Sequence, residues 1–206
     1  MVKEEIRAYV ERAILPCYES FDKGHDISHA KKVIGDSLII AKDFDISLDM
    51  VYVIAAYHDL GLKFGRKDHE KNSGKILVND KALEKWFSRD EIIIMKEAVE
   101  DHRASNDYEP RTVYGKIVAE ADRDTVYETI LTRTIQYSIK NYPDHTIEEH
   151  FERCLAHISE KYGENGYLKL GLETEKNIKG LEKIRLALKN EKQFRADFNR
   201  IFGEIV

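Results

Sequence analysis

Hydrophobic residues recur at helical spacing along almost the whole chain. Apolar positions fall at i, i+3, i+4 and i+7 near the N-terminus, and the same period returns in each later segment. No alternating strand pattern persists, and no internal repeat is visible. The pattern predicts an all-α fold. The expected helices run over about 6–14, 28–43, 48–60, 69–78, 89–105, 110–131, 145–162 and 178–201.

Several helix ends are marked by residues that favour them. Ser47 is a plausible N-cap for the third helix, and Gly61 would stop that helix near Leu60. Ser88 with Glu91 forms a capping box. Pro110 suits the first turn of the helix that follows the "SNDYEP" loop.

Four polar residues lie on inward, apolar faces of three predicted helices. Each alone could be a core residue satisfied by a hydrogen bond, and that is the commoner case. Together they would be costly to bury without a cation between them, and a divalent metal is the simplest such ion. The four are His29, His58, Asp59 and Asp122.

Three segments carry a family resemblance. "GHDISHAKKV" at 24–33, "AAYHDLG" at 55–61 and "AEADRD" at 119–124 resemble the H…HD…D signature of the HD-domain superfamily of metal-dependent phosphohydrolases. The resemblance spans about 20–140 and implies an all-α HD-domain helical bundle. The chain is then expected to be a single HD-type domain over 1–206, with accessory helices at about 145–206. By the same match, the metal ligands are His29, His58, Asp59 and Asp122.

Two of these assignments have a nearby competitor. Asp124 competes with Asp122, but the family pattern places the ligand directly after the alanine, and the inward row agrees. His25 competes with His29, but the apolar period from Ala30 onward favours His29. His25 is instead expected to line the mouth of the pocket.

His69 and His102 stand between the second and third motifs. In binuclear branches of the superfamily, histidines at this order bind a second metal with the motif aspartate, here Asp59, as the bridge. In mononuclear branches they line the pocket and relay protons. The charged neighbours of His69 also allow a plain surface residue. One ion is favoured over two, and Mn, Fe, Ni, Co, Zn and Mg all remain open as its identity.

The resemblance implies hydrolysis of a phosphate ester or anhydride through a metal-activated water, on a nucleotide or related small phosphorylated molecule. Basic residues close to the motifs are candidates to bind phosphate: Lys63, Arg66 and Arg103, with Lys67, Arg123 and Arg133 as weaker ones. Two alternatives have a different chemistry. One is a binuclear-iron oxygenase, which His69 and His102 as ligands would favour. The other is a non-catalytic domain that senses a nucleotide or a metal.

Composition narrows the partners. The 206 residues carry a net charge of −5, so no overall basic field draws the chain to nucleic acid. No window approaches the length of a membrane span, and the N-terminus lacks the apolar core of a secretory signal. Two cysteines fit a reducing compartment, so we expect a cytoplasmic protein. The terminal helix could form a homodimer interface, although packing on its own domain is slightly favoured.

Overall fold

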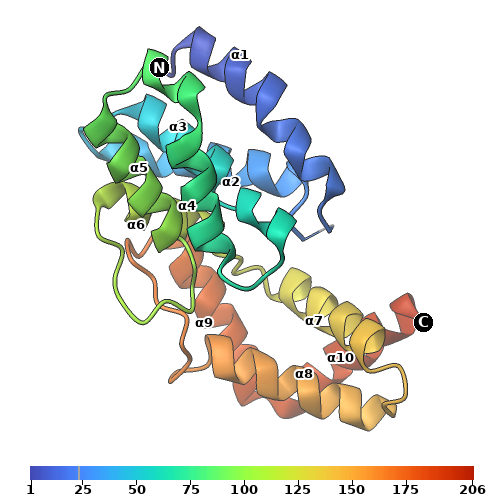
Figure 1. Cartoon of the computed structure of the whole chain (residues 1–206). Helices are drawn as coiled ribbons and strands as arrows, with labels where there is room; N and C mark the ends of the chain where they lie inside the picture. The colour runs from blue at the N-terminus through green and yellow to red at the C-terminus, as the bar shows by residue number, and fades with distance from the viewer. Residues whose placement is uncertain (23) are drawn as a thin grey trace. The chain divides into compact units, whose positions relative to one another are not determined.

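The computed structural model describes residues 1–22 and 24–206, and these residues form helices with no β-strand among them (Figure 1). They divide into two compact units, Met1–Arg123 and Asp124–Val206. The all-α fold predicted from the hydrophobic period is therefore confirmed. That the whole chain forms one HD-type domain with accessory helices stays a prediction.

The first unit contains six α-helices joined in part by 3-10 turns. The α-helices are α1 (Glu4–Ala13), α2 (Ile27–Ile40), α3 (Leu48–Tyr57), α4 (His69–Asn79), α5 (Arg89–Asp101) and α6 (Val113–Asp122). The 3-10 helices are η1 (Leu15–Ser20), η2 (Ala41–Asp43), η3 (Leu60–Phe64) and η4 (Lys81–Lys85).

Helix α3 is the core helix of this unit. Every residue from Met50 to Tyr57 is buried, and α1, α2, α4, α5 and α6 all pack against it. A helix that is apolar on all sides can only be stable when other helices surround it. The residues that follow its C-terminus, His58 and Asp59, are therefore delivered to the interior of the unit.

The polar caps predicted for two helices are present. The Ser47 hydroxyl accepts a hydrogen bond from the backbone N–H of Met50 at 3.3 Å. Ser88 and Glu91 form the reciprocal capping box at the start of α5. Both caps satisfy backbone donors that the first helical turn leaves free.

The predicted end of α3 is wrong. The helix ends at Tyr57, because the buried Tyr18 hydroxyl takes over backbone groups at this end of the helix. That hydroxyl donates to the carbonyl of Ala56 at 2.9 Å and accepts from the N–H of Asp59 at 3.4 Å. The chain therefore turns at Asp59 instead of continuing as an α-helix.

Gly61 does not stop a helix; it lies inside η3. A Cβ atom at this position would lie 2.0 Å from the carbonyl oxygen of His69 and 2.6 Å from the backbone nitrogen of Ser73. Only glycine leaves room for η3 to pack this closely on α4. The close packing brings the start of α4 next to the end of α3.

The helix predicted over 110–131 is interrupted. Pro110 precedes the helix, whose N-cap is Thr112, and α6 ends at Asp122. Arg123 is extended, with φ −64° and ψ 121°. Asp124 Oδ1 then accepts from the N–H of Val126 at 3.2 Å. An aspartate side chain that bonds the backbone in this way competes with helix formation, which the apolar period cannot reveal.

The second unit contains α7 (Tyr127–Asn141), α8 (Ile147–Tyr162), α9 (Glu175–Lys189) and α10 (Glu191–Ile205). The closing segment, predicted as one amphipathic stretch, is divided at Asn190, whose side chain accepts from the N–H of Gln193 at 3.2 Å. Phe151 packs edge-on against Phe194 and Phe198, with ring centroids 5.9 and 5.4 Å away. These three rings anchor the core of the unit.

No helix within 1–22 and 24–206 is both long enough and apolar enough to cross a membrane.

The two cysteines should differ sharply in reactivity. Cys17 is exposed, whereas Cys154 is buried and burial raises the pKa of its thiol to about 11. Because the thiolate is the reactive form, we expect one thiol per native chain to react quickly with Ellman's reagent, and the second only after unfolding. Cys17→Ser should leave no fast-reacting thiol. Two fast thiols in the native wild type would contradict the buried position of Cys154.

A second prediction concerns acid sensitivity. His150 is buried, with Nδ1 2.7 Å from the Ser138 hydroxyl oxygen. Burial lowers the pKa of His150, and the neighbouring His145 and Arg153 lower it further, against the opposing charge of Glu149. Below a pH of about 6.5 the unfolded chain then binds a proton that the folded chain does not. We expect the free energy of unfolding to fall between pH 7 and pH 5.

The variant His150→Gln tests this origin, because glutamine can keep a hydrogen bond to Ser138 but does not titrate. Its urea-unfolding free energy should fall less between pH 7 and pH 5 than that of the wild type. An identical fall in both proteins would assign the acid sensitivity to other groups.

Candidate metal centre

The residues singled out by the sequence meet at the ends of helices in the first unit. His29 lies in the first turn of α2, His58 is the C-cap of α3, Asp59 precedes η3, and Asp122 is the last residue of α6. His29 Nε2 lies 3.1 Å from Asp122 Oδ1 and 3.2 Å from His58 Nε2. His58 Nε2 lies 3.2 Å from Asp59 Oδ2. The structure therefore brings all four together.

His69 and His102 join the same cluster on its other side. Each places its Nε2 atom 3.5 Å from Asp59 Oδ1. Asp59 thus directs one carboxylate oxygen to each pair of histidines, and its side chain is only 4% exposed. Two groups with the spacing of metal ligands share this aspartate: His29, His58 and Asp59, and Asp59, His69 and His102.

Three of the imidazole rings are fixed in one orientation. The Nδ1 atoms of His58, His69 and His102 lie 2.7, 3.0 and 2.6 Å from backbone carbonyl oxygens, in each case that of the residue three positions earlier. A carbonyl can only accept, so each Nδ1 carries a proton and each Nε2 faces the cluster, where it can donate a proton toward Asp59 or, once deprotonated, bind a metal. This is the arrangement in which histidine binds a metal.

The two carboxylates of the cluster, Asp59 and Asp122, need positive charge close to them. Burial lowers the pKa of His29, but hydrogen bonds to Asp122 and Asp59 outweigh burial and raise the pKa to about 9. Burial alone would raise the pKa of Asp59, yet the charge of His58 and the hydrogen bond from His102 hold it well below its usual range. Protons or a metal cation can supply this charge. The donor set of imidazole nitrogens and carboxylate oxygens fits a divalent transition metal.

Two further residues hold the cluster in place: Arg123, which the sequence suggested only as a weak candidate to bind phosphate, and Glu70, which sequence reasoning missed. Arg123 is buried, and its Nη1 donates to the carbonyl of His102 at 2.9 Å, which ties the end of α6 to the end of α5. Glu70 is also buried; its Oε2 lies 3.4 Å from His69 Nδ1 and accepts from Arg103 Nη1 at 2.9 Å. The position of Glu70 directly after His69 was the signal that could have identified it. Its charged neighbours in the sequence instead suggested an exposed residue.

The basic residues proposed to bind phosphate have different surroundings. Arg103 lies beside the cluster through its bond to Glu70. Arg66 is 70% exposed and pairs with Asp22 at 3.7 Å. Lys63 lines a groove whose lining includes no member of the cluster. These three roles stay predictions.

Within the described part of the chain, the remaining candidates form no hydrogen bond or ion pair with the candidate metal ligands. His25 bonds Asp22 at 3.0 Å, and its ring meets that of His29 edge-on at 5.8 Å, so its place at the pocket mouth stays a prediction. Asp124, the competitor of Asp122, pairs with Arg133 at 3.2 Å. Lys67 is exposed.

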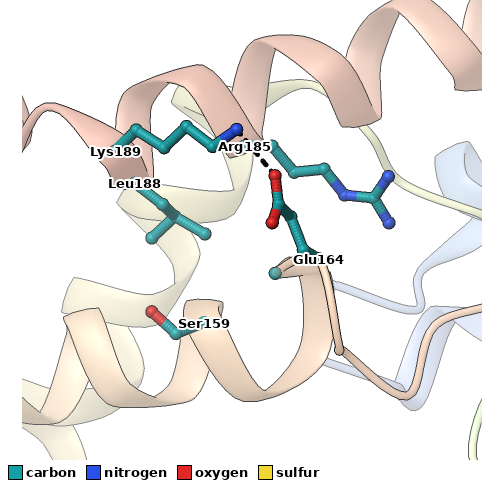
Figure 2. Close-up of a pocket in the computed structure, with 6 residues that line it drawn as sticks. Ser159, Glu164, Arg185, Leu188 and Lys189 are labelled. Atoms are coloured by element: carbon teal, nitrogen blue, oxygen red, sulfur yellow. Dashed lines mark ion pairs between the residues drawn. The ribbon is translucent and has the colours of Figure 1, made fainter.

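The second unit has a pocket of about 220 Å³, and Figure 2 shows the ion pair between Lys189 and Glu164 at this pocket. Lys189 Nζ lies 2.6 Å from Glu164 Oε1, and Arg185 Nε donates to the carbonyl of Tyr162. These groups already have partners, and none of them belongs to a cluster of candidate metal ligands. The pocket is therefore a weaker candidate for chemistry than the centre in the first unit.

Comparisons with known proteins agree with this geometry. Residues 26–126 match the model of the HD domain family, a span that includes all six residues of the cluster. No curated protein matches the chain. Two crystal structures share the fold. One is a predicted HD superfamily hydrolase from an uncultured Thermotogales bacterium, 19% identical with a TM-score of 0.54, covering 95% of this chain and 92% of that one.

The other is Bacillus subtilis YpgQ in complex with ADP. It is 16% identical with a TM-score of 0.58, and the match covers 94% of this chain and 95% of that one. At these identities the likeness concerns the fold. The family match over residues 26–126 and the resemblance predicted from the three motifs agree. The chain belongs to the HD-domain superfamily, through the HD domain at residues 26–126.

Proposed function

We propose that the chain is a metal-dependent phosphohydrolase that acts on a nucleotide or a related small phosphorylated molecule. The observation that carries the proposal is Asp59, a buried carboxylate with the Nε2 atoms of two histidines facing each of its oxygens. A buried carboxylate in this setting would be costly without a cation, and the Nε2 atoms gathered around its two oxygens can, once deprotonated, serve as metal ligands.

The proposed ligands of the first ion are His29, His58, Asp59 and Asp122. His69 and His102, with Asp59, form the second group, and this group favours two ions over the single ion expected from the sequence. A divalent ion held here would lower the pKa of a bound water and offset the charge that develops on a phosphoryl group.

The chain's own residues would orient the substrate. Arg103 lies next to His102 in sequence, and Glu70 fixes one of its guanidinium nitrogens. Its side chain is 36% exposed, so other N–H groups can reach a phosphate at the surface of the cluster. The nucleotide class is supported by the fold neighbour whose crystal structure contains ADP.

The second group also supports a second candidate, a binuclear-iron oxygenase. Histidines on both sides of a shared carboxylate would suit two irons as well as two manganese ions. Iron content distinguishes the two functions, because the oxygenase requires about two irons per chain for activity and a phosphohydrolase would be active with other divalent metals.

Metal content should follow the ligand assignment. Wild-type protein purified without chelators and saturated with Mn²⁺ should retain two ions per chain by elemental analysis. Asp59→Asn should lose both, because both groups contain this carboxylate. His102→Gln should lose only one. Asp124→Asn is the matched control within the "ADRD" motif and should retain both. Full metal content in Asp59→Asn would contradict the proposed centre, and full content in His102→Gln would contradict the second ion.

Activity should follow the same residues. A panel of nucleoside mono-, di- and triphosphates should show release of phosphate or pyrophosphate that stops with EDTA and returns with Mn²⁺. Loss of a ligand in Asp122→Asn should lower kcat by at least about a hundredfold, because even the residues that hydrogen-bond metal ligands are typically worth about 10- to 100-fold. Arg103→Ala should raise KM by about tenfold, because it removes one charge-assisted hydrogen bond to phosphate.

Two controls accompany these assays. Asp124→Asn and Arg133→Ala remove a charged pair that lies outside the cluster, and both should keep kcat and KM within about twofold, as surface substitutions usually do. A nucleotide panel without any metal-dependent turnover would contradict the proposed substrate class.

A further inference from the structure

The first unit contains a groove whose lining includes no candidate metal ligand. It has a volume of about 580 Å³ and lies between η3 and one face of α4. Its lining consists of Lys63, Phe64, Asn72, Lys75, Ile76 and Asn79. None of the six belongs to the histidine and aspartate cluster. The volume falls within the usual range of small-molecule sites, about 300–1,000 Å³.

The two walls of the groove follow from local sequence. Asn72, Lys75, Ile76 and Asn79 are spaced at i, i+3, i+4 and i+7, so they share one face of α4. Seven helical rises separate the first from the last, a length of about 10 Å. Gly61 allows η3 to pack against α4, which places the last residues of η3 along this face. The groove is therefore a fixed feature of the packing of η3 on α4.

The groove combines positive charge with an exposed ring. Phe64 is 67% exposed, and Lys63 Nζ lies 4.9 Å from the centroid of its ring. The lining contains no carboxylate. Among residues 1–22 and 24–206, no acidic side chain forms an ion pair with Lys63 or Lys75. A solvent-exposed ring beside two uncompensated ammonium groups suits a ligand that is both aromatic and anionic.

Amide groups add a third kind of contact. Asn72 and Asn79 both line the groove, and Asn79 uses its Nδ2 atom to donate to the carbonyl of Lys75 at 2.8 Å. The carbonyl oxygens of such amides accept hydrogen bonds from ring amino groups. Stacking on an aromatic side chain, charge on phosphate and amide contacts at the base edge are the means by which proteins hold single nucleotides.

We propose that this groove binds a nucleotide, at a site separate from the metal centre. Phe64 stacks on the base, Lys63 and Lys75 bind the phosphates, and the asparagine amides contact the base edge. Two lysines are too few for a nucleic-acid strand, which is held by a longer track of basic residues. The proposal does not depend on hydrolysis or on a bound metal, because no lining residue is a candidate ligand.

The test is titration calorimetry on the full chain in EDTA, with ADP, adenosine and inorganic pyrophosphate as separate probes. ADP should bind, and its affinity should fall as salt is added. Adenosine, which lacks the charge, and pyrophosphate, which lacks the ring, should each bind at least tenfold more weakly. Asp59→Asn, which disrupts the metal centre, should bind ADP as tightly as the wild type does.

Groove variants locate the site. Phe64→Ala and Lys75→Glu should each weaken ADP binding by about tenfold, in line with the loss of one stacking or phosphate contact. Phe44→Ala and Lys42→Glu are matched controls, because they change a similar pair of side chains at η2, and they should leave the affinity unchanged. All four positions are exposed, so circular dichroism should show an intact helical fold.

Three results would overturn the proposal. One is the absence of ADP binding to the metal-free chain at millimolar concentration. Another is loss of binding in Asp59→Asn, which would place the nucleotide at the metal centre. The last is unchanged affinity in both groove variants. None of these results bears on the metal-dependent activity, which has its own assay.

Discussion

The first unit is organised around one buried carboxylate. Asp59 is 4% exposed, and four imidazole groups surround it. An ionised carboxylate in an apolar core is unfavourable by several kcal/mol unless charge and hydrogen bonds compensate for it. The surrounding helices supply this compensating charge and these hydrogen bonds from several sides. Several of them therefore end close to Asp59.

Helix termini are suited to this task because they leave backbone groups without partners. The carbonyls of Ala55 and Val99 belong to the last turns of α3 and α5, and they accept hydrogen bonds from His58 and His102. One imidazole nitrogen thus satisfies the helix end, while the other faces Asp59. The same ring serves the stability of the helix and the geometry of the site. Long-range support comes from Arg123, which bonds the carbonyl of His102 from the end of α6.

The residues of the cluster could be predicted from the sequence because they are polar residues at inward helical positions that apolar residues otherwise occupy. His29 and His58 fall on inward rows, and the structure places them with Nε2 atoms 3.2 Å apart. The position of His69 was harder to predict, since charged neighbours made it resemble a surface residue. His69 is only partly buried, and its place beside Asp59 depends on Gly61, whose missing side chain lets η3 approach α4; no local pattern reports such a contact.

Helix boundaries were the least predictable feature for a similar reason. The end of α3 depends on the Tyr18 hydroxyl, which comes from a segment 38 residues away from the carbonyl that it bonds. The end of α6 coincides with burial of Arg123 against α5. The spacing of apolar residues indicates which face of a helix points inward. Where α3 and α6 end is determined by hydrogen bonds to residues outside each helix.

Anomalous diffraction from crystals grown with Mn²⁺, recorded at the manganese absorption edge, would locate bound ions beside Asp59. We expect one anomalous peak on each side of Asp59, one near His29 and His58 and the other near His69 and His102. A single peak at the first position would limit the centre to one ion. The absence of any peak beside Asp59 in manganese-saturated crystals would contradict the claim that this buried carboxylate exists to bind a metal.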